Sequence, residues 1–225
     1  MHHRTSSDTL ATPAPTGTAT LAMGCFWKPD ALFGSLEGVV RTRVGYAGGS
    51  TTGPTYWAMA DHIETLQLDY DPEKISYQQL LHTFFASHTP TRQPWKRQYS
   101  SAIFYHTHQQ REQAAQSIKQ LTAQLGKPIY TCLYPCQHFY LAEERHQKYK
   151  LQRQAVLMEE FQALYPNMQD FINSTAAARV KGYLYGYGSR EKLLDQSEAF
   201  GLSPAACQEL LQKASGTGKP ISCAG

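Results

Sequence analysis

Cys25 stands where a thiol could be activated for chemistry. It follows a short apolar run at 18–24 that is typical of a β-strand, and it opens a segment at 25–36 whose apolar spacing indicates a helix. The first turn of a helix presents unpaired backbone N–H groups and the positive end of the helix dipole, and both favour a thiolate. Because the thiolate is the reactive form of cysteine, we interpret Cys25 as a nucleophile, although a lone cysteine is more often a buried structural residue.

Two aromatic residues follow the thiol directly. Phe26 and Trp27 could wall an apolar pocket around a methyl or thioether group beside the nucleophile. Ordinary core packing is the alternative for Phe26, whereas Trp27 at a helix start is harder to explain by packing alone.

Alternating strand and helix patterns must position these residues. Period-two alternation predicts further strands, and apolar residues at helical spacing, with Ser76 as one cap, predict further helices. The expected strands are 18–24, 39–46, 65–70, 101–105 and 129–134, and the expected helices are 25–36, 76–87, 107–125 and 142–161. In the helix at 107–125, Ala114, Ile118, Leu121 and Leu125 share one face. The expected fold class is α/β (α+β): a two-layer sandwich with a mixed β-sheet covered by helices, plus a helical or irregular C-terminal extension.

Both ends of the chain differ in character from its middle. Residues 1–17 are rich in Thr, Ser, Pro and Ala and predict a flexible leader. Short helices are predicted at 191–194 and 204–213, and a Gly-rich, mobile tail at 216–225. Arg179, Lys181 and the tyrosines at 183, 185 and 187 either line a peptide groove or simply pack.

Composition and charge exclude several classes of function. The 225 residues are 41% hydrophobic and carry a formal net charge of +3, too weak to indicate nucleic acid or a membrane surface as a partner. An apolar run of membrane-spanning length is lacking, as is the apolar core of a secretory signal. We therefore expect a cytoplasmic protein, and a monomer.

The cysteine count argues against a disulfide framework. Five cysteines are too few, and odd in number, for a secreted disulfide-rich protein, so reduced thiols are expected. A structural zinc module is a remote alternative, in which Cys132 and Cys136 would be joined by His138 and His146. We expect no metal and no cofactor.

Several segments together resemble the A-type peptide methionine sulfoxide reductases. The resemblance begins at Gly24-Cys25-Phe26-Trp27, which is similar to the GCFW signature of that family, and covers residues 18–152. Further matching segments follow in the family's order: Gly38-Val39, Gly45-Tyr46-Ala47-Gly48-Gly49, Pro54-Thr55-Tyr56, His62-Ile63-Glu64, Tyr70-Asp71-Pro72 with Ile75-Ser76-Tyr77, Gln98-Tyr99 with Ser101-Ala102-Ile103, and Phe139-Tyr140 with Ala142-Glu143 and His146-Gln147.

The resemblance implies roles for the matched residues. The Cys25 thiolate would attack the sulfur of methionine sulfoxide and become a sulfenic acid. Glu64 would protonate the departing oxygen, and Tyr56 and Tyr99 would donate hydrogen bonds to it. The resemblance further implies that Phe26 and Trp27 hold the S-methyl group, and that the S epimer is the substrate, free or in proteins.

Two departures from the family pattern stand out. The family's aspartate after the histidine at position 88 is Thr89 here, and a second aspartate that helps build the polar pocket has no counterpart before Gln98. The connection from Tyr56 to Glu64 is also shorter than usual. A catalytically weakened redox sensor or sulfoxide-binding relative is therefore the alternative to an active enzyme.

A second cysteine would have to resolve the sulfenic acid. By resemblance, the family commonly places this residue in a Gly-rich C-terminal tail and reduces the resulting disulfide with thioredoxin. Cys223 fits best, Cys207 in a predicted helix ranks second and Cys136 third, while Cys132 is assigned to core packing. The resemblance divides the chain into a leader at 1–17, a catalytic domain at 18–160 and an extension at 161–225 that carries the candidate resolving cysteines.

Overall fold

A six-stranded sheet forms the centre of the computed structural model, which describes residues 16–215. The expected leader, apart from its last two residues, and the Gly-rich tail with Cys223 lie outside the described residues. The strand order is β5-β4-β1-β3-β2-β6. The strands are β1 (Gly17–Met23), β2 (Val39–Ala47), β3 (Ile63–Tyr70), β4 (Ser101–Tyr105), β5 (Cys132–Pro135) and β6 (Phe139–Leu141).

The pairing makes this a mixed sheet. β1 lies between β3 and β4 and is antiparallel to both, whereas β4 and β5 are parallel. β2 pairs antiparallel with β3 on one side and with β6 on the other. The strand expected at 129–134 begins three residues later than predicted, at Cys132.

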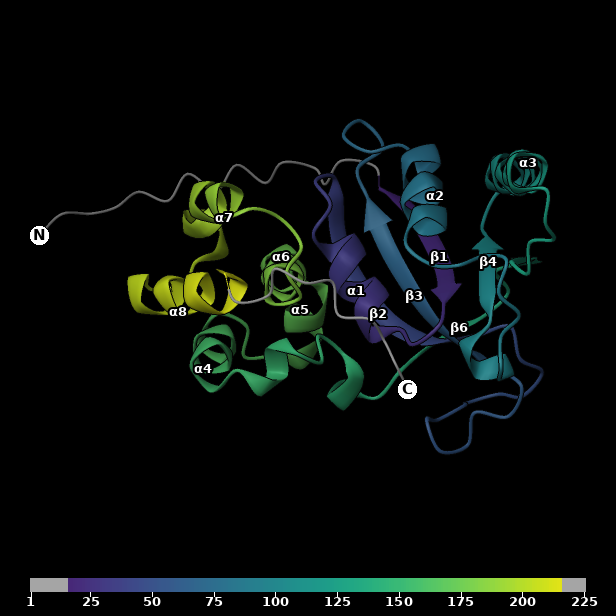
Figure 1. Ribbon diagram of the computed structural model, residues 1–225. Coiled ribbons are helices and arrows are strands. Elements are labelled where there is room, and N and C mark those ends of the chain that lie inside the picture. Colours follow the sequence, from purple (N-terminus) through teal and green to yellow (C-terminus); the bar gives the residue numbers. More distant parts are fainter. Residues whose placement is uncertain (1–15, 216–225) are drawn as a thin grey trace, which may run out of the picture.

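Helices cover one face of the sheet, as expected for a two-layer α/β fold (Figure 1). These are α1 (Trp27–Gly34), α2 (Tyr77–Ala86) and α3 (His108–Leu125). Phe33 of α1 and Phe84 of α2 are buried with Leu21 and Leu66, side chains that alternate toward the helices. The opposite face buries smaller side chains such as Ala22 and Ala102, together with Phe104.

Local capping signals set the ends of two helices. Ser76 and Gln79 form a reciprocal capping box at the start of α2, and Thr107 accepts a hydrogen bond from the backbone N–H of Gln110 at the start of α3. The apolar face expected for α3 is only partly correct. Its buried residues are Gln110 and Ala114, while Leu125 is 43% exposed, because α3 packs at the edge of the sheet.

The helix expected at 142–161 is wrong over its first half. Two short 3₁₀ turns, Glu144–His146 and Leu151–Arg153, lie in this stretch, and the regular helix α4 (Ala155–Leu164) begins only at Ala155. His146, Gln147 and Lys148 are buried in succession, which the single buried face of a surface helix does not allow. The Gln147 side chain extends the sheet instead: its Oε1 accepts from the N–H of Val44 and its Nε2 donates to the Val44 carbonyl.

A second layer of helices packs beside the sheet and has its own core (Figure 1). It comprises α4, α5 (Met168–Asn173), α6 (Thr175–Leu184), α7 (Arg190–Gln196) and α8 (Pro204–Ser215). The helices predicted at 191–194 and 204–213 are confirmed by α7 and α8. In the described part of the chain, no helix has the length and apolarity needed to cross a membrane.

The α6 helix lies directly on α1. A Cβ atom at Gly34 would come within 2.7 Å of the Ala178 carbonyl oxygen, so a glycine is needed for this approach. Arg179 donates to the carbonyl oxygens of Gly34 at the end of α1 and of Val39 at the start of β2. Arg179, Lys181 and Tyr183 are all buried. For these three residues the prediction of packing is therefore correct, and the prediction of a peptide groove is wrong.

A fully buried ionic cluster joins α1, β2 and α6. The carboxylate of Asp30 accepts a hydrogen bond from the Lys181 ammonium, and its Oδ1 lies 3.5 Å from Lys148 Nζ. Lys148 also donates to Thr42 Oγ1 at 2.9 Å. Burial alone would raise the pKa of Asp30, but the two ammonium groups outweigh it and lower this pKa to about 2.

Asp30→Asn is expected to lower the free energy of unfolding by about 3–5 kcal/mol at neutral pH, because it leaves two buried ammonium groups without their carboxylate. The folded-state pKa lies below the ordinary 3.8. The stabilisation is therefore present above about pH 4 and is lost as pH falls toward 2. Urea denaturation across this pH range measures both effects.

The matched control is Asp61→Asn, at a partly exposed carboxylate that also accepts hydrogen bonds. This variant should keep a urea midpoint close to that of the wild type, because substitutions at surface positions change stability little. Equal losses in the two variants would contradict the role of the buried cluster.

Candidate active site

Cys25 lies between the end of β1 and the start of α1. Gly24 has φ of +97°, a conformation that favours glycine and that turns the chain from the strand into the helix. Phe26 is the N-cap residue of α1 and makes no hydrogen bond with its side chain. The backbone N–H groups of the first turn therefore lack a side-chain cap, and Cys25, which is half-buried, directly precedes them.

The Glu64 carboxyl group is buried beside this turn. Its Oε2 accepts from the backbone N–H of Phe26 at 3.1 Å, and its Oε1 accepts from the Gln98 amide at 2.7 Å. Burial raises the pKa of Glu64, and these two hydrogen bonds offset the shift only in part. A carboxyl group with a raised pKa can donate a proton closer to neutral pH.

Tyr99 lies near the other expected site residues. It lies in a short 3₁₀ turn (Arg97–Tyr99) before β4. Burial raises the pKa of Tyr99 to about 12, with smaller contributions from Glu64, Tyr56 and Cys25. All three groups are thus within electrostatic range of its hydroxyl, which stays protonated and able to donate a hydrogen bond at neutral pH.

Glu143 anchors the loop that carries Tyr56. Its Oε1 accepts from the backbone N–H of Tyr56 at 3.0 Å, and its Oε2 accepts from the Tyr46 hydroxyl on β2 at 2.7 Å. Burial opposes ionisation of Glu143, but the hydrogen bonds it accepts and the charge of Arg145 outweigh that effect and lower its pKa. The loop is therefore tied to the sheet through an ionised carboxylate.

Aromatic rings surround the start of α1. Trp27 stacks on Tyr149, with ring centroids 3.6 Å apart and an 11° angle between the planes. Phe26 is 1% exposed and lies 5.5 Å from the His146 ring, which is also 4.7 Å from Tyr56. Burial lowers the pKa of His146, so a neutral imidazole belongs to this wall. Such a surface suits a methyl thioether.

Sequence reasoning overlooked several contributors to the site. Gln98, Tyr46 and Glu143 lie within segments quoted for the resemblance but were not singled out as site residues, and His146 was given a role only as a ligand of the zinc alternative. Tyr149 lies just beyond those segments and gave no local signal. Their contacts join positions far apart in the sequence, which helical or strand periodicity does not report.

Cys132 and Cys136 lie at opposite ends of β5, and of these two only Cys136 was a candidate resolving cysteine. Cys132 is opposite Ala102, at the same end as Cys25, whereas Cys136 follows Pro135 at the other end, about 13 Å along the strand direction. Burial raises the pKa of both Cys136 and Cys207. Cys223 lies outside the described residues. Among residues 16–215, no three His, Cys, Asp or Glu side chains are grouped so as to hold a metal ion.

The segment that departs from the family pattern forms an exposed rim. Trp95 is 63% exposed and its ring lies 5.4 Å from Tyr99, while Trp57 is 85% exposed beside Tyr56. Arg97 donates to the carbonyl oxygens of Asp61 and Gly48, which holds the intervening loop against the site.

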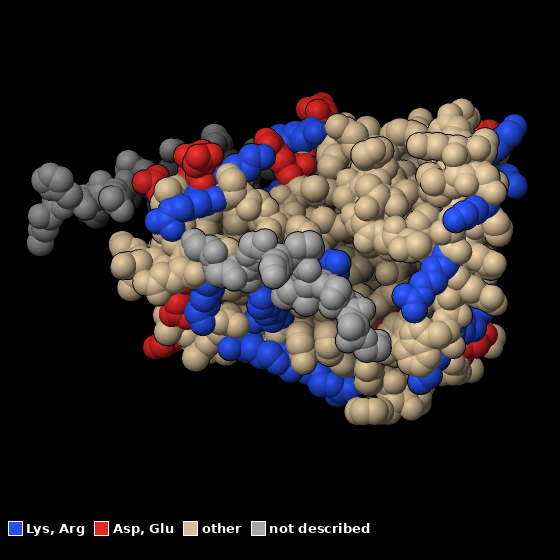
Figure 2. Space-filling view, in the orientation of Figure 1, with Lys and Arg blue, Asp and Glu red and all other residues tan. Residues whose placement is uncertain are grey.

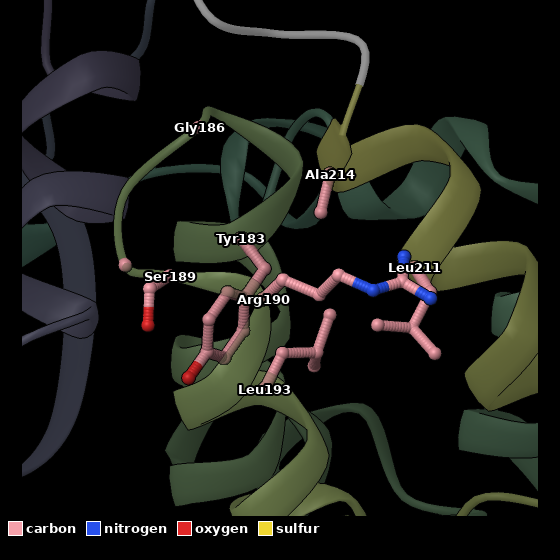
Figure 3. Close-up of a pocket in the computed structure, with 8 residues that line it drawn as sticks. Tyr183, Gly186, Ser189, Arg190, Leu193, Leu211 and Ala214 are labelled. Carbon is pink, nitrogen blue, oxygen red and sulfur yellow. The ribbon is translucent and has the colours of Figure 1, made fainter.

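A small hollow in the C-terminal layer is separate from the site (Figure 3). It lies where the segment that joins α6 to α7 meets α8, with Tyr183, Leu193 and Leu211 among its lining residues. On the face shown in Figure 2, acidic side chains gather near α7, and basic side chains follow the lower edge. Neither feature contains a residue expected from the sequence to perform chemistry.

Comparisons with known proteins agree on one family. The family model for peptide methionine sulfoxide reductase matches residues 17–179. The chain is 41% identical to a peptide methionine sulfoxide reductase of Drosophila melanogaster over 193 residues, which covers 85% of this chain and 77% of the relative. It is 40% identical to a peptide methionine sulfoxide reductase MsrA of Methanococcus maripaludis over 149 residues, covering 62% of this chain and 95% of the relative.

Solved structures show the same fold. Mxr1 from Saccharomyces cerevisiae in reduced form matches with a TM-score of 0.58 and 29% identity, over 64% of this chain and 88% of that one. Methionine sulfoxide reductase A of Corynebacterium diphtheriae matches with a TM-score of 0.54 and 31% identity, over 63% and 76%. Each structural match leaves more than a third of this chain uncovered.

Proposed function

Because this chain belongs to the peptide methionine sulfoxide reductase family, we propose that it reduces the S epimer of methionine sulfoxide through the thiolate of Cys25. The family is one of oxidoreductases, and the resemblance seen in the sequence is confirmed. The single observation that carries the mechanism is that the buried Glu64 carboxyl group accepts a hydrogen bond from the backbone N–H of Phe26, the residue that follows Cys25.

The chemical step transfers oxygen from the substrate to the enzyme. The Cys25 thiolate attacks the sulfoxide sulfur and forms an S–S bond, while Glu64 gives its proton to the oxygen. The S–O and S–S bonds of this adduct then break as the hydroxyl group moves to the Cys25 sulfur. Methionine leaves, and the oxygen remains on Cys25 as a sulfenic acid. Tyr56 and Tyr99 donate hydrogen bonds to the oxygen, and Phe26 and Trp27 hold the methyl group.

A second cysteine then resolves the sulfenic acid. Its thiol condenses with the sulfenic acid, which forms a disulfide and releases water, and a dithiol such as thioredoxin reduces the disulfide. We propose Cys223 for this role and Cys207 as the second choice. Cys136 ranks last because it lies at the far end of the strands. In this proposal residues 18–160 are catalytic, and residues 161–225 carry the resolving thiol.

Reduction of a synthetic peptide with one methionine sulfoxide of known configuration tests this function. With dithiothreitol as reductant, the S epimer is expected to be consumed with one methionine formed per sulfoxide, while the R epimer persists. Thioredoxin with its reductase should replace dithiothreitol. Binding of the S epimer without turnover would contradict the enzyme and favour a sulfoxide-binding protein.

The resolving thiol can be identified from a single turnover. After one equivalent of sulfoxide and no reductant, mass spectrometry of digested protein is expected to show a Cys25–Cys223 disulfide. In Cys223→Ser, a Cys25 sulfenic acid should accumulate and react with dimedone, or a Cys25–Cys207 disulfide should replace it. Cys136→Ser, a matched control, should leave the wild-type disulfide in place, and its loss there would contradict the ranking.

A further inference from the structure

The proposed chemistry leaves Lys181 without a role, although this residue is costly to bury. Its ammonium group is fully buried and belongs to the cluster with Asp30 and Lys148, of which every member is 0% exposed. An isolated buried charge is strongly unfavourable unless it is paired. The cluster has two ammonium groups and one carboxylate, so full protonation of both lysines leaves one positive charge in excess.

The excess charge lies near the nucleophile. Asp30 is in the first turn of α1, five residues after Cys25, and its backbone N–H donates to the Phe26 carbonyl oxygen. Burial lowers the pKa of Lys181, while Asp30 and the Cys25 thiolate act in the opposite direction. For Lys148 burial also lowers the pKa, to about 8; Asp30 opposes this shift and the charge of Lys181 adds to it. Lys181 makes the hydrogen bond to Asp30 in the first turn of α1, whereas Lys148 donates to Thr42 on β2.

We propose that Lys181 is a positioning residue for the reaction, whose positive charge beneath α1 stabilises the Cys25 thiolate. The thiolate in turn supplies the second anion that the cluster lacks. The residue belongs to α6, so the C-terminal helical layer contributes to the electrostatics of the nucleophile and does more than carry a resolving thiol.

Other groups that act on the thiol come from different elements. Glu64 on β3 and the hydroxyl groups of Tyr99 and Tyr56 face the site, and burial raises the pKa of Tyr99 to about 12, so Tyr99 is uncharged at neutral pH. His146, in the aromatic wall, has a pKa lowered by burial and is neutral there. Lys181 is then the cation that the structure brings within electrostatic range of Cys25 on the α6 side.

The pH dependence of Cys25 alkylation tests this role, with Lys181→Met compared with Lys148→Met. Both variants remove one fully buried ammonium group from Asp30, so their structural damage is matched. Lys181→Met is expected to raise the pH midpoint of iodoacetamide alkylation by about one pH unit, which means about tenfold slower alkylation at neutral pH. Lys148→Met should shift it by less than about a third as much, since direct charge effects weaken with distance.

Alkylation is read by mass spectrometry of the peptide that contains Cys25, at a temperature where both variants keep the wild-type near-ultraviolet circular dichroism. Alkylation does not depend on sulfoxide turnover. The role of Lys181 can therefore be contradicted while the proposed function holds, and the proposed function can be contradicted while the role of Lys181 holds. Equal midpoints in Lys181→Met and the wild type would overturn the proposal. Equal shifts in both lysine variants would also overturn it, because they would report loosening of the cluster.

A reciprocal measurement does not require Lys181 to be replaced. NMR titration of the lysine Nζ groups is expected to show a lower pKa for Lys181 in Cys25→Ala than in the wild type, because the thiolate no longer favours its protonated form. The charge of Lys181 lowers the pKa of Lys148, so the pKa of Lys148 should change by less and in the opposite direction. An unchanged Lys181 titration would overturn the proposal even if Lys181→Met failed to fold.

Discussion

Cys25→Ser is expected to lower the rate of sulfoxide reduction by about 10⁴-fold or more, to below detection. A serine hydroxyl does not ionise at neutral pH, and its oxygen cannot take up the sulfoxide oxygen as a sulfur atom does. The loss should be as large in a single turnover without reductant as in steady state, because the first chemical step is removed.

The matched control is Cys132→Ser, at a half-buried thiol on the same end of the sheet. This variant should retain a single-turnover rate within about threefold of the wild type, a spread typical of substitutions away from the reacting groups. Stoichiometric methionine release by Cys25→Ser would contradict the assignment of the nucleophile.

Glu64→Gln is expected to slow the same single turnover by about 10² to 10⁴-fold, the usual contribution of a general acid. The side chain keeps its size, and the Gln98 amide can rotate to accept from the new amide group, so the site should stay assembled. Substrate binding should change little, because the lost proton is needed only once the thiolate attacks.

The pH profile separates this role from packing. Glu64 must be protonated to act, and burial raises its pKa. The wild-type rate should therefore fall as pH rises through that pKa, and this limb should be absent in Glu64→Gln. Glu144→Gln, at an exposed carboxylate beside the aromatic wall, should leave rate and profile unchanged. A profile with the same alkaline limb in Glu64→Gln would contradict the assignment.

Much of the fold and of the reacting group could be predicted because the signals are local. A short apolar run marked β1, alternation marked β3, Ser76 marked the start of α2, and Gly126 with Pro128 marked the end of α3. Cys25 was found from its place between a strand, a glycine and a helix. The roles of Glu64, Tyr56 and Tyr99 came from the family resemblance, since each alone is an ordinary carboxylate or tyrosine. Those roles stay predictions.

The errors fall where polar side chains are buried by distant partners. Gln147 and Lys148 are followed by residues of good helical propensity, yet their side chains bond to Val44 and Thr42 on β2, more than 100 positions earlier. For Arg179 and Lys181 the sequence left a peptide groove and packing as open alternatives. Their carbonyl and carboxylate partners lie on α1 and at the start of β2, and no local pattern reports that pairing.

The pairing of β2 with β6 has a consequence for biosynthesis. β2 ends at Ala47, and the strand that covers its outer edge begins only at Phe139. A ribosome adds about 5–20 residues per second, so roughly 90 further residues leave this edge uncovered for roughly 5–20 s. An uncovered, largely apolar strand edge can pair with another nascent chain. This interval is where a chaperone that shields strand edges would most improve the yield of folded protein.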